Sequence, residues 1–262
     1  MLSFDLAGKT ALVGGSTQGI GLASAQAMAS MGARCILISR SEEKLKAAIN
    51  TLPIKNGVQH RYLVANYTIP EQVKEVLSTF LENDSIDILI NNTGGPASGL
   101  IINAKPEEFM QAFQQHLICN HLLTTLVVEG MKKQGYGRII NVISTSVKIP
   151  LKELGVSNTI RAAVAGWAKT MANELGQYGI TVNNVLPGFT TTERLATILR
   201  FKAEKTGKTI QEIEKEMLEE VPLRRFGKPE EIAAMVAFLA TPAASYINGT
   251  SIPVDGGRTG SI

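Results

Sequence analysis

The chain has 262 residues, and 44% of them are hydrophobic, which is enough for one large α/β core or for two small ones. The net charge is +3, the Lys and Arg residues are spread along the chain, and aromatic residues make up only 5%. This composition argues against a nucleic-acid-binding surface, which needs clustered cations with interleaved aromatic side chains.

The N-terminal segment MLSFDLAGKT has neither a charged n-region nor an apolar h-region, so it predicts no signal peptide. No apolar run reaches the roughly 18 residues that a membrane span needs, so we expect no membrane partner. Cys35 and Cys119 lie in apolar runs, which predicts buried thiols in a reducing compartment. We therefore expect a cytoplasmic protein, and the spacing of its residues offers no metal site.

Short apolar runs alternate with longer helical patterns along the whole chain. The expected strands are TALVGG, RCILIS, RYLVAN, IDILINN, GRIINVIS, ITVNNVLP and TSIPVDGG, and the expected helices cover 19–31, 42–50, 70–82, 106–133, 156–178 and 229–240. This alternation predicts right-handed crossovers and one doubly wound parallel sheet of the Rossmann type, with helices on both faces. Because we find no linker or repeat, residues 1–262 are expected to form a single domain.

A glycine-rich segment, VGGSTQGIG, follows the first expected strand. Gly15 allows a sharp turn, while Gly19 and Gly21 let the backbone approach a pyrophosphate and let the helix pack closely on the sheet. The N-terminus of that helix offers free N–H groups and partial positive charge. A glycine turn with a purely structural role is the alternative, but the strand–turn–helix context favours a dinucleotide site.

The second expected strand ends at Ser39 and Arg40, where an NAD site places a carboxylate for the ribose 2′-hydroxyl. A hydroxyl followed by a guanidinium suits a 2′-phosphate instead. The alternative is a solvated arginine at the start of a helix. We predict NADP(H) as the cofactor, in preference to NAD(H).

Residues 192–221 hold two helical pieces where one crossover is expected. Thr209 and Glu212 form a capping box. An apolar stripe at helical spacing follows, made of Ile210, Ile213, Met217 and Val221. The segment follows the carboxyl end of a strand, where ligands bind, so it is either a substrate lid that hinges at EKTGKT or a passive cover.

Several long motifs then occur in a characteristic order: GGSTQGIG, NNTGG, GRIINVIS, VNNVLPGFTTT and PLRRFGKPEEIAAMVAFLATPAASYINGTSIPVDGG. With these motifs the chain resembles the short-chain dehydrogenase/reductase family over essentially its whole length. The resemblance implies a sheet of seven parallel strands and, commonly, a homotetramer. The C-terminal block is most similar to that of bacterial 3-oxoacyl-acyl-carrier-protein reductases, which implies a small-molecule or acyl-thioester substrate.

The resemblance also implies cofactor roles for residues of this chain. In the family pattern the phosphates lie against Gly15, Ser16, Gly19, Ile20 and Gly21, and Arg40 faces the adenosine ribose. Asn66 stands beside the adenine, and Asn92 and Gly94 lie under the cofactor, with Thr93 where alanine is usual. Pro187, Gly188 and Thr192 would lie near the nicotinamide.

Four family residues carry the reaction: an Asn, a Ser, a Tyr and a Lys. The Asn and the Ser correspond to Asn120 and Ser144, but the Tyr and the Lys correspond to Ser157 and Arg161. A serine hydroxyl is a far weaker acid than a tuned phenol. Arg161 can still bind a ribose hydroxyl, but a guanidinium stays protonated and relays no proton. This chain is therefore expected to lack the proton relay of the family, which runs through the Tyr and the Lys.

Other side chains of the chain could in principle supply the proton. The tyrosines (62, 67, 136, 178 and 246) are placed by the sequence at strand edges or helix ends, away from the nicotinamide. Lys148 and Lys152 follow Ser144 in a loop that should border the substrate, either as a desolvated acid or as solvated lysines. His116 and His121 are interpreted as packing or interface residues.

Two hypotheses stay open at this point. One is an NADP(H)-dependent oxidoreductase with a remodelled site, which uses Asn120, Ser144, Ser157 and Arg161 with a loop lysine or a water as acid. The other is a protein that binds the cofactor without redox turnover, as a sensor or an oligomer partner.

Overall fold

The computed structural model describes residues 3–261, and its centre is a seven-stranded parallel sheet with the order β3-β2-β1-β4-β5-β6-β7. The strands are β1 (Thr10–Gly14), β2 (Arg34–Ser39), β3 (Arg61–Val64), β4 (Ile88–Asn91), β5 (Gly137–Val142), β6 (Ile180–Pro187) and β7 (Ser251–Val254). The order reverses between β1 and β4, and all neighbouring strands are parallel. The predicted doubly wound sheet is confirmed.

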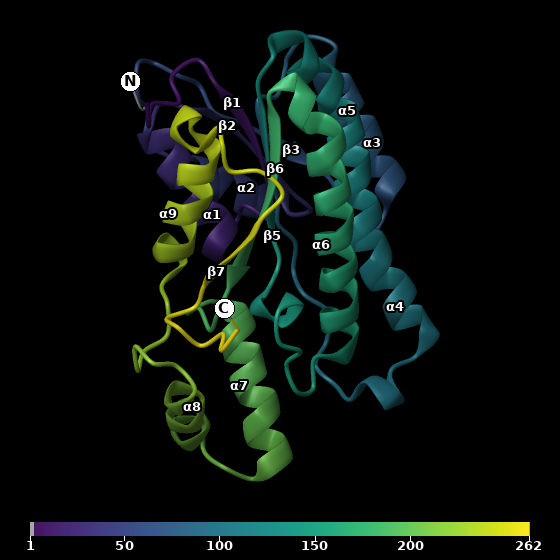
Figure 1. Cartoon of the computed structure of the whole chain (residues 1–262), viewed down its shortest axis with the longest axis vertical. Helices are drawn as coiled ribbons and strands as arrows, with labels where there is room; N and C mark the ends of the chain where they lie inside the picture. The colour runs from purple at the N-terminus through teal and green to yellow at the C-terminus, as the bar shows by residue number, and fades with distance from the viewer. Residues whose placement is uncertain (1–2, 262) are drawn as a thin grey trace.

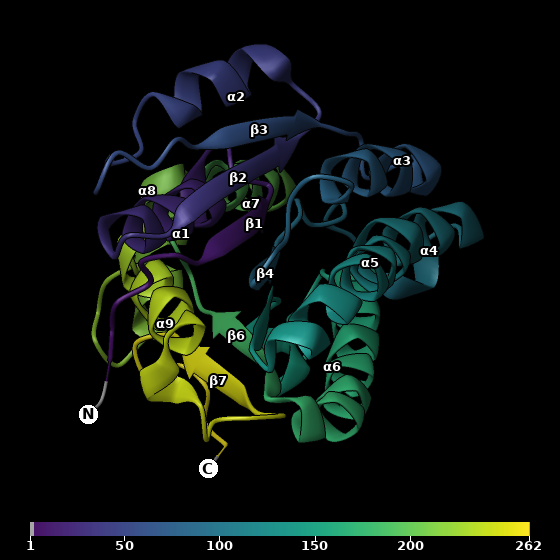
Figure 2. The same cartoon turned by 90° about the horizontal axis from the view of Figure 1, so that it is seen from above.

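Helices cover both faces of the sheet (Figures 1 and 2). One face carries α1 (Gly19–Ser30), α2 (Glu42–Ile49) and α9 (Pro229–Ala240), and the other carries α3 (Pro70–Leu81), α5 (Cys119–Gln134) and α6 (Gly155–Leu175). Within residues 3–261, none of these helices combines the length and the hydropathy needed to cross a bilayer.

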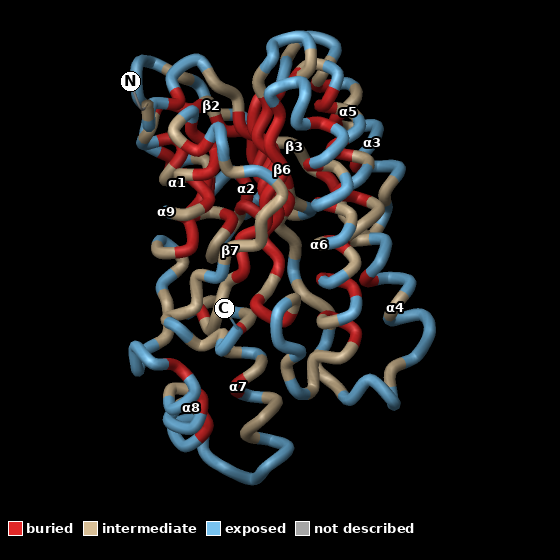
Figure 3. The backbone as a smooth tube through the Cα atoms, in the orientation of Figure 1, coloured by how far each residue is buried: buried red, intermediate tan, exposed pale blue. Residues whose placement is uncertain are grey.

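Successive strand residues point to opposite faces, and the two cores follow from that alternation. In β1, Ala11 and Val13 join the core under α1 and α9, whereas Leu12 joins the core under α3, α5 and α6. Buried residues accordingly concentrate in the strands and on the inner sides of the helices (Figure 3). Because both faces are covered, the strands read as continuous apolar runs.

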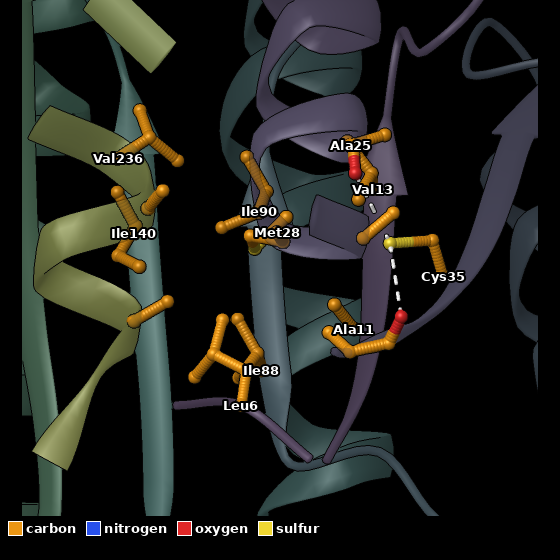
Figure 4. Close-up of a cluster of buried hydrophobic side chains, with 14 of the residues drawn as sticks. Leu6, Ala11, Val13, Ala25, Met28, Cys35, Ile88, Ile90, Ile140 and Val236 are labelled. Carbon is orange, nitrogen blue, oxygen red and sulfur yellow. Dashed lines mark hydrogen bonds between the residues drawn. The ribbon is translucent and has the colours of Figure 1, made fainter. Parts of the chain in front are cut away.

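Cys35 lies inside the first of these cores, where its thiol donates to the Ala25 carbonyl at 3.4 Å (Figure 4). Burial raises the pKa of Cys35 to about 12, so its thiol is not reactive near neutral pH. Cys119 is also free and buried. The prediction of two buried thiols is confirmed.

The helix expected over 106–133 is interrupted. The structure has α4 (Pro106–Phe113), a π-helical turn (Gln114–Ile118) and then α5. A π turn adds one residue to the helical repeat and changes which side chains face inward, and such turns are frequent at functional sites. Here the turn brings His116 to the interior, one helical turn before the buried Asn120.

The segment 192–221 forms α7 (Glu193–Thr206) and α8 (Ile210–Glu219), which protrude beyond the sheet (Figure 1). A small core of its own joins the two helices, made of Leu195, Leu199, Ile213 and Met217. The predicted Thr209–Glu212 capping box is present. The predicted stripe is wrong at Ile210, which is 40% exposed because it lies at the first position of α8, outside the contact with α7.

Candidate active site

A cavity of about 1340 Å³ opens where the strands end at their carboxyl edge. The loops that follow each of the strands β1 to β6 contribute to its wall, and residues of α7 line it as well. Ligands of open parallel sheets bind at this edge, next to the point where the strand order reverses. Fourteen of the residues predicted for the site line it: Gly15, Gly19, Ile20, Ser39, Arg40, Asn66, Asn92, Gly94, Ser144, Ser157, Arg161, Pro187, Gly188 and Thr192.

The glycine-rich turn after β1 has the geometry that a phosphate site requires. Gly15 and Gly19 both have φ of +55°, a left-handed conformation that other residues rarely adopt. A Cβ added at Gly21 would lie 2.3 Å from the Gly15 carbonyl oxygen. The N-cap of α1, Gln18, makes no side-chain capping bond, so the first N–H groups of α1 are left for an anion.

The adenosine end of the cavity carries positive charge. Arg40 is exposed, and within residues 3–261 no carboxylate lies within ion-pair distance of it. Lys44 lines the same part of the wall. These free cations beside Ser39 fit a ribose 2′-phosphate.

The floor of the cofactor end is held by side-chain amides. Asn92 Nδ2 donates to the Gly14 carbonyl at 3.1 Å and fixes the end of β4 against the glycine turn. Asn66 Oδ1 accepts from the Thr68 N–H at 3.1 Å and keeps a second lone pair. Thr192 caps α7 by accepting from the Leu195 N–H, and its hydroxyl donates to the Thr190 carbonyl. The residues present therefore fit a dinucleotide with a 2′-phosphate.

Three predicted residues lie outside the cavity wall. Ser16 is fully buried, with its hydroxyl turned into the protein, so only its backbone is placed near the glycine turn. Gly21 packs against Gly15 and supports the turn from behind. Asn120 lies beneath the wall on α5, and its Oδ1 has no hydrogen-bond partner among the described residues.

Ser144, Ser157 and Arg161 meet at the other end of the cavity. Ser144 follows β5, and its oxygen accepts from the Ser146 N–H at 3.1 Å, which leaves its own proton free to donate. Ser157 lies in the first turn of α6, and Arg161 lies four residues later on the same face. These two residues therefore line the same cavity as Ser144.

Arg161 is only 9% exposed, and its Nη1 donates to the Val142 carbonyl at 3.1 Å. Burial lowers the pKa of Arg161 to about 10, and the charge of Arg194 lowers it further in the same direction. The guanidinium is still protonated at neutral pH. It supplies positive charge and hydrogen-bond donors, and it does not supply a proton.

A pair that the sequence did not predict lies at the cavity floor. The hydroxyl of Thr93, which lines the cavity, is 2.6 Å from His116 Nδ1. Burial, followed by the charge of Arg161, lowers the pKa of His116 to about 3, so the imidazole is neutral at pH 7. His116 is buried, as expected for a packing histidine. Its contact with Thr93, a residue of the cavity wall, was not predicted.

The lysines and tyrosines that could replace the missing acid differ in whether they reach the cavity. Lys152 lines the cavity, whereas Lys148 does not. Tyr67 was placed at a strand edge by the sequence, and this is wrong: the loop after β3 turns inward, and a Cβ added at Gly14 would lie 2.9 Å from its hydroxyl. Burial raises the pKa of Tyr67 above its usual range, which makes its phenol a poorer acid.

Arg194 is a second residue that the sequence reading missed. It extends from the first turn of α7 to the loop after β4, where a Cβ added at Gly95 would lie 3.4 Å from its Nε. Its side chain lines the cavity. The only signal in the sequence was a cation two residues after Thr192, in a segment interpreted as lid. Within residues 3–261, no group of three metal-ligating side chains lies together.

Comparison with known proteins places this architecture in a family. The sequence pattern of the family described as Enoyl-(Acyl carrier protein) reductase matches residues 15–259. The chain is 36% identical over 256 residues to 3-oxoacyl-acyl-carrier-protein reductase FabG of Vibrio cholerae, which covers 97% of this chain and 98% of that protein. The chain belongs to the short-chain dehydrogenase/reductase family. It is an oxidoreductase of that family.

Two further relatives support the assignment. FabG of Haemophilus influenzae is 37% identical over 254 residues, with 95% of this chain and 98% of that protein covered. L-sorbose reductase of Gluconobacter frateurii, solved with NADPH and L-sorbose, superimposes with a TM-score of 0.92 at 29% identity and covers 99% of each chain. The similarity therefore extends over the whole family domain, including the lid segment.

Proposed function

We propose that the protein is an NADP(H)-dependent carbonyl oxidoreductase, with Ser144 as the hydrogen-bond donor to the substrate oxygen. The observation that carries the proposal is a single cavity that runs from the glycine turn to the free Ser144 hydroxyl. Hydride transfer needs the cofactor and the carbonyl to share one enclosed space, and this cavity provides it. The NADPH in the sorbose reductase structure supports the same choice of cofactor.

The cofactor, when bound, supplies or accepts the hydride, and the residues of the chain hold it and the substrate. The glycine turn and the N-terminus of α1 bind its phosphates, and Arg40 with Ser39 binds the 2′-phosphate. The rest of the cofactor lies against six residues that line the cavity: Asn66, Asn92, Gly94, Pro187, Gly188 and Thr192. Arg161 reaches the ribose side of the nicotinamide end.

Negative charge grows on the substrate oxygen when a carbonyl is reduced. Ser144 donates a hydrogen bond to that oxygen, and the permanent charge of Arg161 stabilises it electrostatically. Because Ser157 is too weak an acid and Arg161 keeps its proton, the proton comes from a water molecule in the cavity or from Lys152. Asn120 Oδ1 and His116 Nε2 are buried without a hydrogen-bond partner among the described residues, and they can order such a water molecule.

The proposal also specifies which bond of the substrate is reduced, a carbonyl bond and not a carbon–carbon double bond. The family description names an enoyl reductase, whereas the curated relatives are 3-oxoacyl reductases. The retained Ser144 favours a carbonyl, since its hydroxyl is placed to bind an oxygen. A 3-oxoacyl thioester is therefore one candidate substrate beside smaller carbonyl compounds.

The decisive experiment measures NADPH consumption against a panel of carbonyl compounds, acyl thioesters included, with the NADPH dissociation constant determined in parallel. Turnover that depends on Ser144 supports the proposal. Stoichiometric NADPH binding without turnover above background across the panel would instead support the second hypothesis, a cofactor-binding protein without redox activity.

Assembly and location belong to the same proposal. We expect a homotetramer, as the C-terminal motifs imply, and exposed apolar side chains such as Phe4 and Tyr246 are available for subunit contacts. The free, buried cysteines fit a reducing cytoplasm. Sedimentation analysis of the purified protein tests the tetramer, and a stable monomer would refute it.

A further inference from the structure

Two arginine residues from different helices line the cavity. Arg161 comes from α6 and Arg194 from α7. Arg161 is more than nine-tenths buried, and among the described residues its guanidinium makes one hydrogen bond, to the Val142 carbonyl. Four of its five N–H donors are therefore left for a ligand.

Neither guanidinium is neutralised by the protein. Within residues 3–261, no carboxylate lies within 4.0 Å of Arg161 or Arg194. The cavity wall holds four glutamates, and three of them pair with other cations: Glu153 with Lys205, Glu193 with Arg200 and Glu220 with Arg258. The fourth, Glu214, lies on α8 and makes no ion pair with either arginine.

Two like charges in a partly desolvated space repel each other, and an anion between them removes that repulsion. The effect is visible in the chain itself, because the charge of Arg194 lowers the pKa of Arg161. The charges also depress the pKa of His116, so this histidine adds no further cation. The cavity thus holds an excess of positive charge at the end where the substrate lies.

We propose that Arg161 and Arg194 form a subsite for an anionic group of the substrate, so that the preferred substrates carry a carboxylate a few bonds from the reacting carbonyl. The inference rests on the proposed function, because it takes Ser144 as the anchor of the carbonyl. Ser157, one turn before Arg161, has a short side chain and leaves room for the anion where the family has a phenol ring. Paired guanidinium groups bind planar oxyanions through parallel hydrogen bonds.

A different occupant would be the pyrophosphate of the cofactor itself, which shares the same anionic chemistry. The two sources differ in what they predict for a variant at Arg194. A substrate subsite changes the preference between an acid and its neutral ester. A cofactor contact changes the dissociation constant of NADPH and leaves that preference as it was.

The experiment uses the full-length protein and matched substrates: 2-oxo-, 3-oxo- and 4-oxopentanoate, each with its methyl ester, and dihydroxyacetone phosphate with dihydroxyacetone as a phosphate arm. The ratio of kcat/KM for acid over ester is measured for the wild type, for Arg194→Gln and for Arg194→Lys. Lys215→Gln is the control, since Lys215 lies on the neighbouring helix α8, is exposed, does not line the cavity and forms no ion pair within residues 3–261.

We expect the wild type to prefer at least one acid over its ester by roughly tenfold or more, as for a hydrogen bond between charged groups. Arg194→Gln should reduce this ratio to near one, Arg194→Lys should keep part of it, and Lys215→Gln should keep all of it. A preference for the phosphate pair alone would place a phosphate in the subsite and overturn the carboxylate. No preference in the wild type, or an unchanged ratio with weaker NADPH binding in Arg194→Gln, would overturn the subsite.

A binding measurement separates this inference from the proposed function. Calorimetric titration of the NADP⁺-loaded protein with each acid requires no turnover. Saturable binding of an oxopentanoate that Arg194→Gln weakens roughly tenfold upholds the subsite, even if no substrate in the panel is reduced. Turnover of esters with no such binding would uphold the reductase and overturn the subsite.

Discussion

The two ends of the cavity differ in whether backbone or side-chain atoms form the binding surface. Where we propose that the cofactor phosphates bind, the ligand would meet backbone: two glycines with positive φ, a third too close to its neighbour to carry a side chain, and the free N–H groups that begin α1. At the substrate end it meets side chains, namely Ser144, Ser157, Arg161 and Arg194. The first end therefore depends on the fold, and the second can change without disturbing it.

This difference supports the proposal that the chain keeps the family fold while its substrate end departs from the family pattern. In the predicted register, Ser157 and Arg161 stand where the family pattern has a phenol and a lysine, and both residues are tolerated in a helix such as α6. The same freedom does not exist at Gly15 or Gly21. Substitutions at the two ends should accordingly fail in different ways.

The largest effect is expected at the substrate end, from Ser144→Ala. Loss of the hydroxyl that we propose binds the substrate oxygen should lower kcat by about 100- to 1,000-fold, as for the removal of one donor from an oxyanion site. NADPH affinity, measured by fluorescence titration, should stay within about twofold of the wild type, because Ser144 makes none of the proposed contacts to the cofactor. Turnover that survives Ser144→Ala would remove this residue as the substrate anchor.

The opposite pattern is expected at the cofactor end, from Gly21→Ala. The new Cβ would lie 2.3 Å from the Gly15 carbonyl oxygen and 2.7 Å from Asn92 Nδ2, so the glycine turn must shift. We expect NADPH binding to weaken by roughly 10- to 100-fold, in line with the cost of overpacking.

Gly166→Ala is the matched control for this variant. Gly166 lies in α6 with nothing within 4 Å of an added Cβ. Alanine there should raise the melting temperature slightly, since it is the better helix former, and should not change the affinity for NADPH. Equal binding by Gly21→Ala and Gly166→Ala would show that the close packing of Gly21 has no role in the cofactor site.

Most of the fold could be predicted because its signals are local and redundant. Apolar runs such as those around Leu12 and Ile90 report strands covered on both faces, and the glycine turn reports where a phosphate binds. The interruption of the helix at 114–118 could not be predicted, because a π turn results from competing side-chain packing. The exposure of Ile210 was missed for a related reason: periodicity finds a stripe, but it does not tell where a neighbouring helix ends.

The substrate end could be predicted only in part. Ser144, Ser157 and Arg161 follow from their spacing after β5, which the parallel register converts into proximity. Arg194 and Thr93–His116 depend on contacts between segments far apart in the chain, such as that between α7 and Gly95. No periodic pattern encodes such contacts, so only the folded chain reveals them.

A smaller effect is expected from Arg40→Ala, which tests how far side chains contribute at the cofactor end. Arg40 is exposed, so the loss of its charge-assisted hydrogen bonds to a 2′-phosphate should weaken NADPH binding by about tenfold. NADH has no such phosphate and serves as the internal control: its affinity should stay constant. An equal loss for both cofactors would mean that Arg40 acts on the loop and not on the phosphate.

The smallest effect is expected from His116, as a change of stability with pH. The folded chain holds the pKa of His116 near 3, chiefly through burial and then through Arg161, whereas the unfolded chain takes up the proton near pH 6.5. Between these values the unfolded state binds more protons, so the free energy of unfolding rises with pH, by up to about 1.4 kcal/mol per pH unit, and levels off above pH 6.5.

Urea unfolding of the wild type and of His116→Gln between pH 5 and 7 isolates this contribution, since most carboxylates are already ionised in that range. We expect a shallower pH dependence in His116→Gln. His121→Gln is the control and should keep the wild-type slope. His121 is exposed, and its hydrogen-bond partner within residues 3–261 is Trp167. Equal slopes for the wild type and His116→Gln would mean that His116 takes up a proton as readily in the folded state as in the unfolded state, near pH 6.5. The substrate end would then hold a third cation, and His116 would be a candidate acid.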